Sequence, residues 1–141
     1  MPISLVGSEM CIRDRNRFKD FVLNETDLSD NLIPGIPSQM LDLELLLKLS
    51  KKNTLILTNR LIGERYADNL NENLIASYNI FNVKYSKGIL KNSEFSIGVN
   101  NLFNQEFYDN IRINAFGKRY YEPAPKRNFY FGLNFSFWLD F

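Results

Sequence analysis

The sequence contains no histidine and only one cysteine, Cys11. Without histidine it lacks the commonest general base and the commonest metal ligand, and a conventional Ser-His-Asp site cannot be built. A single cysteine can neither close an internal disulfide nor give a metal site its second thiol. We therefore expect no enzyme active site and no bound cofactor in this chain.

Excess charge and long apolar runs are absent as well. The 17 basic and 16 acidic residues leave a net charge of +1, which argues against a nucleic-acid partner. No run of about 18 apolar residues occurs, which excludes a transmembrane helix. The apolar residues recur instead at every second position, a pattern that a search for apolar helices misses.

The segment from Gln39 to Ser50 shows this alternation best. One parity is all leucine, whereas the other carries Asp42, Glu44 and Lys48. A helix would scatter these charges among the leucines, so period two predicts a strand. Leucine is a poor strand former in soluble sheets, and a face made only of leucine indicates a partner without a defined shape, such as lipid.

The last segment, residues 128–141, has the same alternation over a greater length. Large apolar residues fill every odd position from Phe129 to Phe141. A typical soluble strand has about five or six residues, whereas a transmembrane strand needs about nine to eleven. The segment therefore predicts a strand that crosses a membrane.

Further strands are expected at three similar segments and, with weaker patterning, at a first one. These are Thr54 to Tyr66, Ala76 to Lys87, Glu94 to Asn101 and, first in the chain, Arg17 to Leu23. A bulge is expected near Tyr78–Phe81, where the alternation slips. The fold class is thus all-β, with about six antiparallel strands in a meander, as in transmembrane barrels.

The connections between these strands alternate in length. Residues 50–53 and 88–92 are short turns, whereas residues 24–38, 67–73 and 109–126 are longer and polar. Short turns at one rim and long loops at the other are typical of outer-membrane barrels.

The first fifteen residues, Met1 to Arg15, are set apart from the fold. They lack the basic start and apolar core of a signal peptide. Residues 10–15 (MCIRDR) resemble sequencing-adapter DNA that has been translated at the edge of a gene. We expect residues 1–15 to be non-native, disordered and detached, and residues 16–141 to form the barrel portion. The alternative is a genuine polar N-terminal arm.

Three motifs carry a resemblance to a known family. Residues 100–109 (NNLFNQEFYD), with Asn101, Leu102, Phe103 and Tyr108, are similar to the "NLFD…Y" signature of TonB-dependent receptors. Residues 121–129 (YEPAPKRNF), with Pro123, Arg127 and Phe129, resemble that family's approach to its final strand, although Ala124-Pro125-Lys126 replaces the usual Pro-Gly spacing. Residues 33–37 (IPGIP) resemble a loop of the same family, and the final Phe141 resembles its C-terminal assembly signal.

The resemblance implies the C-terminal part of a barrel of about 22 strands. A plug domain and a TonB-contacting box would belong to the same protein but are not in this chain. As a segment the sheet would be open and curved, with the long loops outside the cell. The implied partners are outer-membrane lipid and lipopolysaccharide, the barrel-assembly machinery, TonB through the plug, and a small-molecule nutrient.

By resemblance, the protein would import a scarce nutrient such as a ferric siderophore, haem or cobalamin. Tyr66, Arg112, Lys118 and Arg119 are candidate ligand-facing loop residues, because an aromatic ring can stack on a ligand and cations can attract an anionic complex. Plain polar loops or lipopolysaccharide contact would explain the same residues. Two other functions stay open: a passive outer-membrane porin, and a small soluble β-barrel that binds an apolar ligand.

Overall fold

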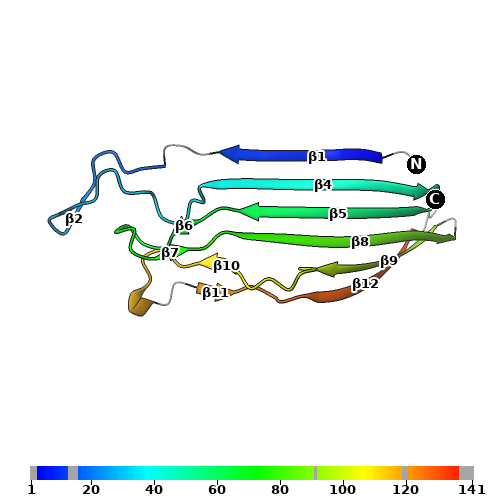
Figure 1. Ribbon diagram of the computed structural model, residues 1–141. Coiled ribbons are helices and arrows are strands. Elements are labelled where there is room, and N and C mark those ends of the chain that lie inside the picture. Colours follow the sequence, from blue (N-terminus) through cyan, green and yellow to red (C-terminus); the bar gives the residue numbers. More distant parts are fainter. Residues whose placement is uncertain (1–2, 13–15, 91, 119–120, 137–141) are drawn as a thin grey trace, which may run out of the picture.

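The computed structural model describes residues 3–12, 16–90, 92–118 and 121–136. Its main element is a six-stranded sheet in which neighbouring strands follow one another along the chain (Figure 1). The strands are β1 (Ile3–Ile12), β4 (Gln39–Ser50), β5 (Asn53–Ile62), β8 (Tyr78–Leu90), β9 (Ser93–Asn100) and β12 (Asn128–Phe135). Every pairing between them is antiparallel. The prediction of an open, all-β meander is confirmed.

Three two-stranded hairpins extend the long connections. They are β2 (Val22–Leu23) with β3 (Thr26–Asp27), β6 (Arg65–Tyr66) with β7 (Leu74–Ile75), and β10 (Tyr108–Ile111) with β11 (Tyr121–Pro123). All three lie at one end of the sheet, opposite the short β4–β5 and β8–β9 turns (Figure 1). The helical content of the described chain is the 3-10 turn η1 (Phe116–Lys118), and no described helix is long and apolar enough to cross a membrane.

The register gives the sheet one apolar and one polar face. Paired residues of antiparallel strands project to the same side, so each row across the sheet belongs to one face. One row runs through Leu45, Leu57, Val83, Val99 and Phe129. Together with the rows of the same parity it forms the apolar face, which is largely leucine, valine and phenylalanine.

The next positions along the strands form the polar face. One of its rows runs through Lys48, Thr54, Ser86, Ser96 and Gly132. Asp42, Glu44 and Lys84 belong to the same face. The charges that alternate with leucine in the sequence are therefore gathered on one side of the sheet.

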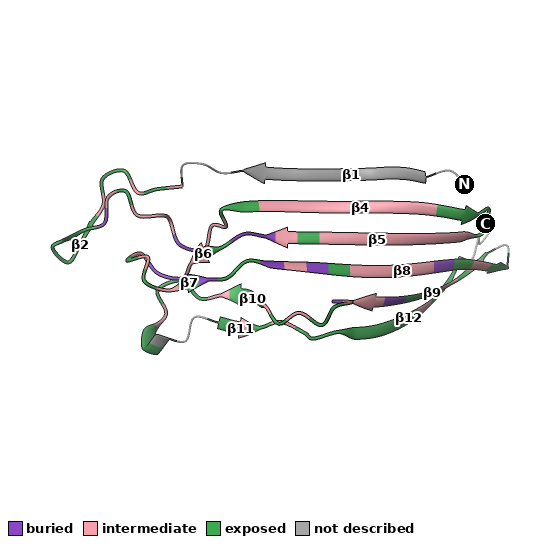
Figure 2. Ribbon diagram, in the orientation of Figure 1, coloured by how far each residue is buried: buried purple, intermediate pink, exposed green. Residues whose placement is uncertain are grey.

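The apolar face has no core built over it within the described chain. On β12, Phe129 is 73% and Phe131 77% exposed, and most of β4 and β5 is only half-buried (Figure 2). Burial concentrates instead at the loop end, where Ile62, Tyr78 and Ile80 pack together. The strands thus present a large apolar surface to something outside this part of the chain.

Two expectations about the N-terminal region are wrong. Arg17 to Leu23 does not form a strand of the main sheet, because it contributes one bridge, Arg17 to Leu32, and the short β2. Ile3–Ile12, expected to be detached and disordered, forms β1 and pairs with β4. An open strand edge offers unpaired N–H and C=O groups to any extended segment, and Arg17 to Leu23 lacks the alternation of a strand. The adapter-like origin of residues 1–15 stays a prediction.

The bulge expected near Tyr78–Phe81 is also absent. The β5–β8 register runs without a shift from Ile62 opposite Tyr78 to Asn53 opposite Lys87. The alternation slips in the sequence because Tyr78 and Ile80 leave the pattern of the polar face and join the buried cluster at the loop end. The irregularity in β8 lies between Gly88 and Leu90, next to the turn into β9.

Candidate functional site

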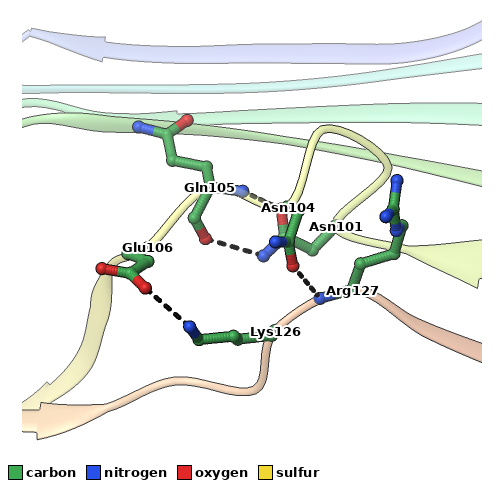
Figure 3. Close-up of polar contacts among 6 residues, drawn as sticks. All are labelled: Asn101, Asn104, Gln105, Glu106, Lys126 and Arg127. Carbon is green, nitrogen blue, oxygen red and sulfur yellow. Dashed lines mark hydrogen bonds and ion pairs between the residues drawn. The ribbon is translucent and has the colours of Figure 1, made fainter.

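The motif residue Asn101 ends β9 and starts a tight turn. It is 3% exposed and has a positive φ of 53°, a conformation that asparagine tolerates better than most residues. Its side chain accepts from the Gln105 amide and donates to the Gln105 carbonyl, both at 2.8 Å (Figure 3). Its own amide donates to Asn82 Oδ1 at 2.9 Å, which ties the turn to β8.

The next two motif residues fold the turn back onto β8. The Leu102 amide donates to the Phe81 carbonyl at 2.8 Å. The ring of Phe103 meets the ring of Phe81 edge-on, with centroids 5.2 Å apart, and Phe103 remains 68% exposed. Phe81 projects from the apolar face, so Phe103 extends that face towards the loops.

The second motif meets the first at this turn. The Arg127 amide donates to Asn104 Oδ1 at 3.0 Å (Figure 3). Arg127 Nη1 lies 3.4 Å from the Leu102 carbonyl oxygen. Lys126 Nζ is 2.7 Å from Glu106 Oε1, and this contact raises the pKa of Lys126 and lowers the pKa of Glu106. The start of β12 is thus fixed against the end of β9, and Phe129 follows directly on the apolar face.

Tyr108 and Pro123 complete the same arrangement. They face each other in the β10–β11 pair, and the Tyr108 and Tyr121 rings lie with centroids 4.8 Å apart. The Ala124 amide donates to the Phe107 carbonyl at 3.0 Å. Two motifs about twenty residues apart are therefore one structural unit that shapes the last loop. Phe141 lies outside the described residues.

The candidate ligand-facing residues lie in two different loops, and Tyr66 lies beside a cavity. Tyr66 belongs to β6, and its carbonyl accepts from the Gly35 amide at 2.8 Å. It lines a cavity of about 310 Å³ between the first long loop and the β6–β7 hairpin, together with Ile33, Ile36 and Leu74. Asn16, Ser38, Glu64 and Arg65 also line this cavity, so its walls are partly apolar and partly polar.

The predicted basic cluster is only partly described. Arg112 lies 2.6 Å from Glu122, whose carboxylate also accepts from Asn110 at 2.8 Å. These side-chain hydrogen bonds, from Asn110 first and Arg112 second, lower the pKa of Glu122. The charge of Arg112 is therefore matched by a neighbouring carboxylate. Lys118 belongs to η1 but its side chain is not described, and Arg119 lies outside the described residues.

Sequence reasoning missed a polar network in the second long loop. Asp68 is 6% exposed, and its carboxylate accepts from the amides of Glu72 and Asn73 and from the Asn73 side chain. Burial disfavours the charged form, yet these hydrogen bonds together hold the pKa of Asp68 below its usual value. The run ADNLNEN over residues 67–73 was the available signal, because Asn and Asp favour such local hydrogen bonds. Within the described residues no acidic or thiol cluster suits a metal ion.

No protein-family model matches the chain. Solved structures do. The siderophore receptor PiuA from Acinetobacter baumannii matches with a TM-score of 0.71 and 18% identity, over 82% of this chain and 17% of the receptor. The described chain has the fold of a segment of outer-membrane receptor β-barrel wall.

Two further receptors support this fold. The ferric-catecholate import receptor Fiu from Escherichia coli K12 matches with a TM-score of 0.64 and 20% identity, over 75% of this chain and 15% of the receptor. A ferric enterobactin receptor (PfeA) mutant from Pseudomonas aeruginosa matches with a TM-score of 0.60 and 21% identity, over 77% of this chain and 17% of the receptor. The chain therefore spans less than a fifth of the length of each of these receptors.

Proposed function

We propose that this chain forms part of the barrel wall of a TonB-dependent outer-membrane receptor that imports a ferric siderophore. The observation that carries the proposal is the apolar face, whose rows from Leu45 to Phe129 and from Leu47 to Phe131 cross the sheet from β4 to β12, opposite a polar face, with all long loops at one end. Lipid is the partner that such a face requires, since nothing in the described chain covers it.

The dimensions of the wall suit an outer membrane. The 12 residues of β4, at about 3.3 Å each and a tilt of about 40°, span roughly 30 Å along the membrane normal. The apolar band of such barrels is about 25 Å tall. Apolar side chains of this face would lie against lipid, and the loop end would reach the cell surface and its lipopolysaccharide.

The polar face suits a water-filled or plugged interior. Arg60 Nε and Asp42 Oδ1 are 3.1 Å apart on this face, with side chains 56% and 49% exposed. An exposed pair of this kind contributes little to stability. Its charges would instead keep the side of the wall that faces the lumen hydrated. Energy for transport would come through TonB acting on a plug domain. The barrel-assembly machinery would recognise β12. The proposed role is transport without catalysis.

The solved receptors that share this fold support ferric siderophores as the substrate class to propose. A ferric-catecholate import receptor and a siderophore receptor share the fold, and a copper transporter matches as well. Ferric siderophores are therefore the first substrates to test, before haem or cobalamin. The cavity beside Tyr66 and the last loop are the parts of this chain within reach of such a ligand.

The test measures uptake of radiolabelled ferric siderophores in cells expressing the receptor that carries this chain, in strains with and without TonB. The proposal expects recovery in the outer-membrane fraction and uptake that disappears without TonB. Uptake that persists without TonB would identify a passive porin instead. Recovery in the soluble fraction would support the small apolar-ligand binder.

A further inference from the structure

The three long connections meet at the loop end of the sheet. They are loop A (residues 24–38), loop B (residues 63–77) and loop C (the described residues 101–118 and 121–127). Loop B lies between the other two and has hydrogen bonds to both. Because its partners are about 38 to 45 residues away in sequence, these bonds are tertiary contacts and not local turns.

Loop A is joined to loop B through asparagine side chains. The Leu32 amide donates to Asn71 Oδ1 at 2.7 Å, and Asn71 Nδ2 donates back to the Leu32 carbonyl at 2.8 Å. The Asn71 side-chain amide thus pairs with the Leu32 backbone as the backbone of one residue pairs with that of another in an antiparallel sheet. Asn31 Nδ2 adds a third bond, to the Asn69 carbonyl at 2.9 Å.

Backbone bonds extend the same junction towards the sheet. The Gly35 amide donates to Tyr66 at 2.8 Å and the Ser38 amide to Glu64 at 2.9 Å. Loop A is therefore attached to loop B along most of its second half.

Loop C is joined to loop B in a similar way. The Asn114 amide donates to the Ala67 carbonyl at 2.9 Å, and the Asn69 amide donates to Asn114 Oδ1 at 3.0 Å. Ala67 and Ile75 of loop B are buried, and Ile111 and Ala115 of loop C pack against them. Loop C is thus attached by a small apolar contact, by these two hydrogen bonds and by a third, from Arg65 Nη2 to the Tyr108 carbonyl at 3.1 Å.

Loops A and C also touch each other directly. A Cβ placed on Gly35 would lie 2.7 Å from Ile113 Cδ1, so the glycine backbone is in close contact with that side chain. Gly35 has a φ of 79°, and Asn71 and Asn114 have φ values of 59° and 53°. Asparagine thus supplies at two junctions both a left-handed backbone and an amide that reaches the next loop.

We propose that loops A, B and C form a single mechanical unit, with loop B as its centre, so that a displacement of one loop is transmitted to the other two. Coupling of this kind is carried by contiguous networks of hydrogen bonds and packed side chains, and the Asn71 and Asn114 junctions form such a network across the three loops. A ligand that touches only loop C therefore alters the order of loop A.

The test is hydrogen–deuterium exchange of the full-length receptor in outer-membrane vesicles, a setting that rests on the proposed function. The Asn71→Gly variant removes the side chain but keeps the positive φ accessible. The matched control is Asn69→Gly, two residues away, because the described structure gives the Asn69 side chain no hydrogen bond. The Asn71→Gly variant loses two hydrogen bonds to loop A and a third, to the Asp68 carbonyl within loop B. Loss of the two bonds to loop A predicts amide exchange roughly tenfold faster in that loop. A single unit predicts that loop C also exchanges faster, with little change in the control.

A second variant, Asn114→Gly, breaks the junction on the other side. The proposal expects faster exchange in loop A, to which Asn114 makes no hydrogen bond among the described residues. The double variant should show less than the product of the two single effects. Exchange that rises only in the loop directly contacted, or effects that multiply independently, would overturn the proposal. Fractionation of the same cells reports on the outer-membrane assignment separately.

Discussion

Strand β4 and loop B are separated by a single strand in the chain, yet different forces hold them. In β4 the leucines share a face with Leu55 and Leu57 of β5, and that face is covered by nothing in the described chain. In loop B the Asn71 side chain donates to the Leu32 carbonyl, and the Asp68 carboxylate accepts from both the amide and the side chain of Asn73. The strands of the wall therefore depend on surroundings that cover their apolar face, whereas the loop end is stabilised by its own hydrogen bonds.

This contrast separates two kinds of sequence requirement. Lipid needs an apolar side chain but no particular shape, so any large apolar residue suits the outer positions of the wall. A hydrogen bond needs one donor and one acceptor at a defined distance, so Asn71 or Asn101 cannot be exchanged freely. Substitutions that affect only one of the two regions can break or sharpen the comparison.

The largest effect is expected from a charge on the apolar face. Leu45→Arg puts a cation near the middle of β4 on the lipid side, at an expected cost of about 2–4 kcal/mol. Leu46→Arg is the matched control, since Leu46 pairs with Ile56 on the polar face. Urea titration of the assembled barrel, followed by heat-modifiable gel mobility, measures both. Equal losses would mean that the two faces do not differ in environment.

The motif turn should give the next largest effect. Asn101→Ala removes both bonds to Gln105 and leaves half-buried backbone groups unpaired, for which we expect about 1–3 kcal/mol. Asn100→Ala removes one exposed bond to Asn128 and serves as the control. The same titration should separate the neighbours clearly. A null result at Asn101 would mean that these hydrogen bonds do not stabilise the turn.

A smaller effect is expected where the wall does depend on shape. The Tyr130 ring covers Gly98 on the polar face, so the Cβ of Gly98→Ala would overlap it. Because the overlapping atoms are the far end of a partly exposed side chain, displacing the ring should cost about 1 kcal/mol. Tyr130→Ala should abolish that cost in the double variant. Gly88→Ala is the control, because its Cβ would lie at an ordinary 3.6 Å from Lys52 Cβ. Absence of rescue would locate the strain elsewhere.

The smallest effect concerns the pH response of loop B. The pKa of Asp68 is held below its ordinary 3.8, so ionised Asp68 favours the folded loop. That contribution is fully present above about pH 4 and is lost as the pH falls through the lowered pKa. Amide exchange of residues 67–73, corrected for its intrinsic pH dependence, should show loosening only in acid. Asp68→Asn should remove this transition, and an unchanged profile would contradict it.

The wall could be predicted from the sequence because its pattern is local. Leu41 to Leu49 and Phe129 to Phe135 alternate without interruption, and register follows once both faces are recognised. The edge of β4 could not be predicted in the same way. Its partner is chosen by competition between segments, and Ile3–Ile12 took the position expected for Arg17 to Leu23.

The loop end was predicted as polar and long, but not as a network. The bonds of Asn31 and Asn114 to loop B join residues whose sequence neighbours give no sign of their partners. The motifs around Asn101 and Arg127 were found as a resemblance, and the structure explains the physical reason for their residue types. Asparagine supplies the positive φ of that turn, and Arg127 fixes the next strand to it.

The unbroken rows of the apolar face have a consequence for descent. Since a lipid-facing leucine can become isoleucine, valine or phenylalanine at little cost, lineages can diverge at these positions without any loss of architecture. The asparagine junctions at the loop end tolerate far fewer replacements and should drift slowly. Amino-acid substitutions would then accumulate fastest in the wall, although the wall is the region whose shape changes least.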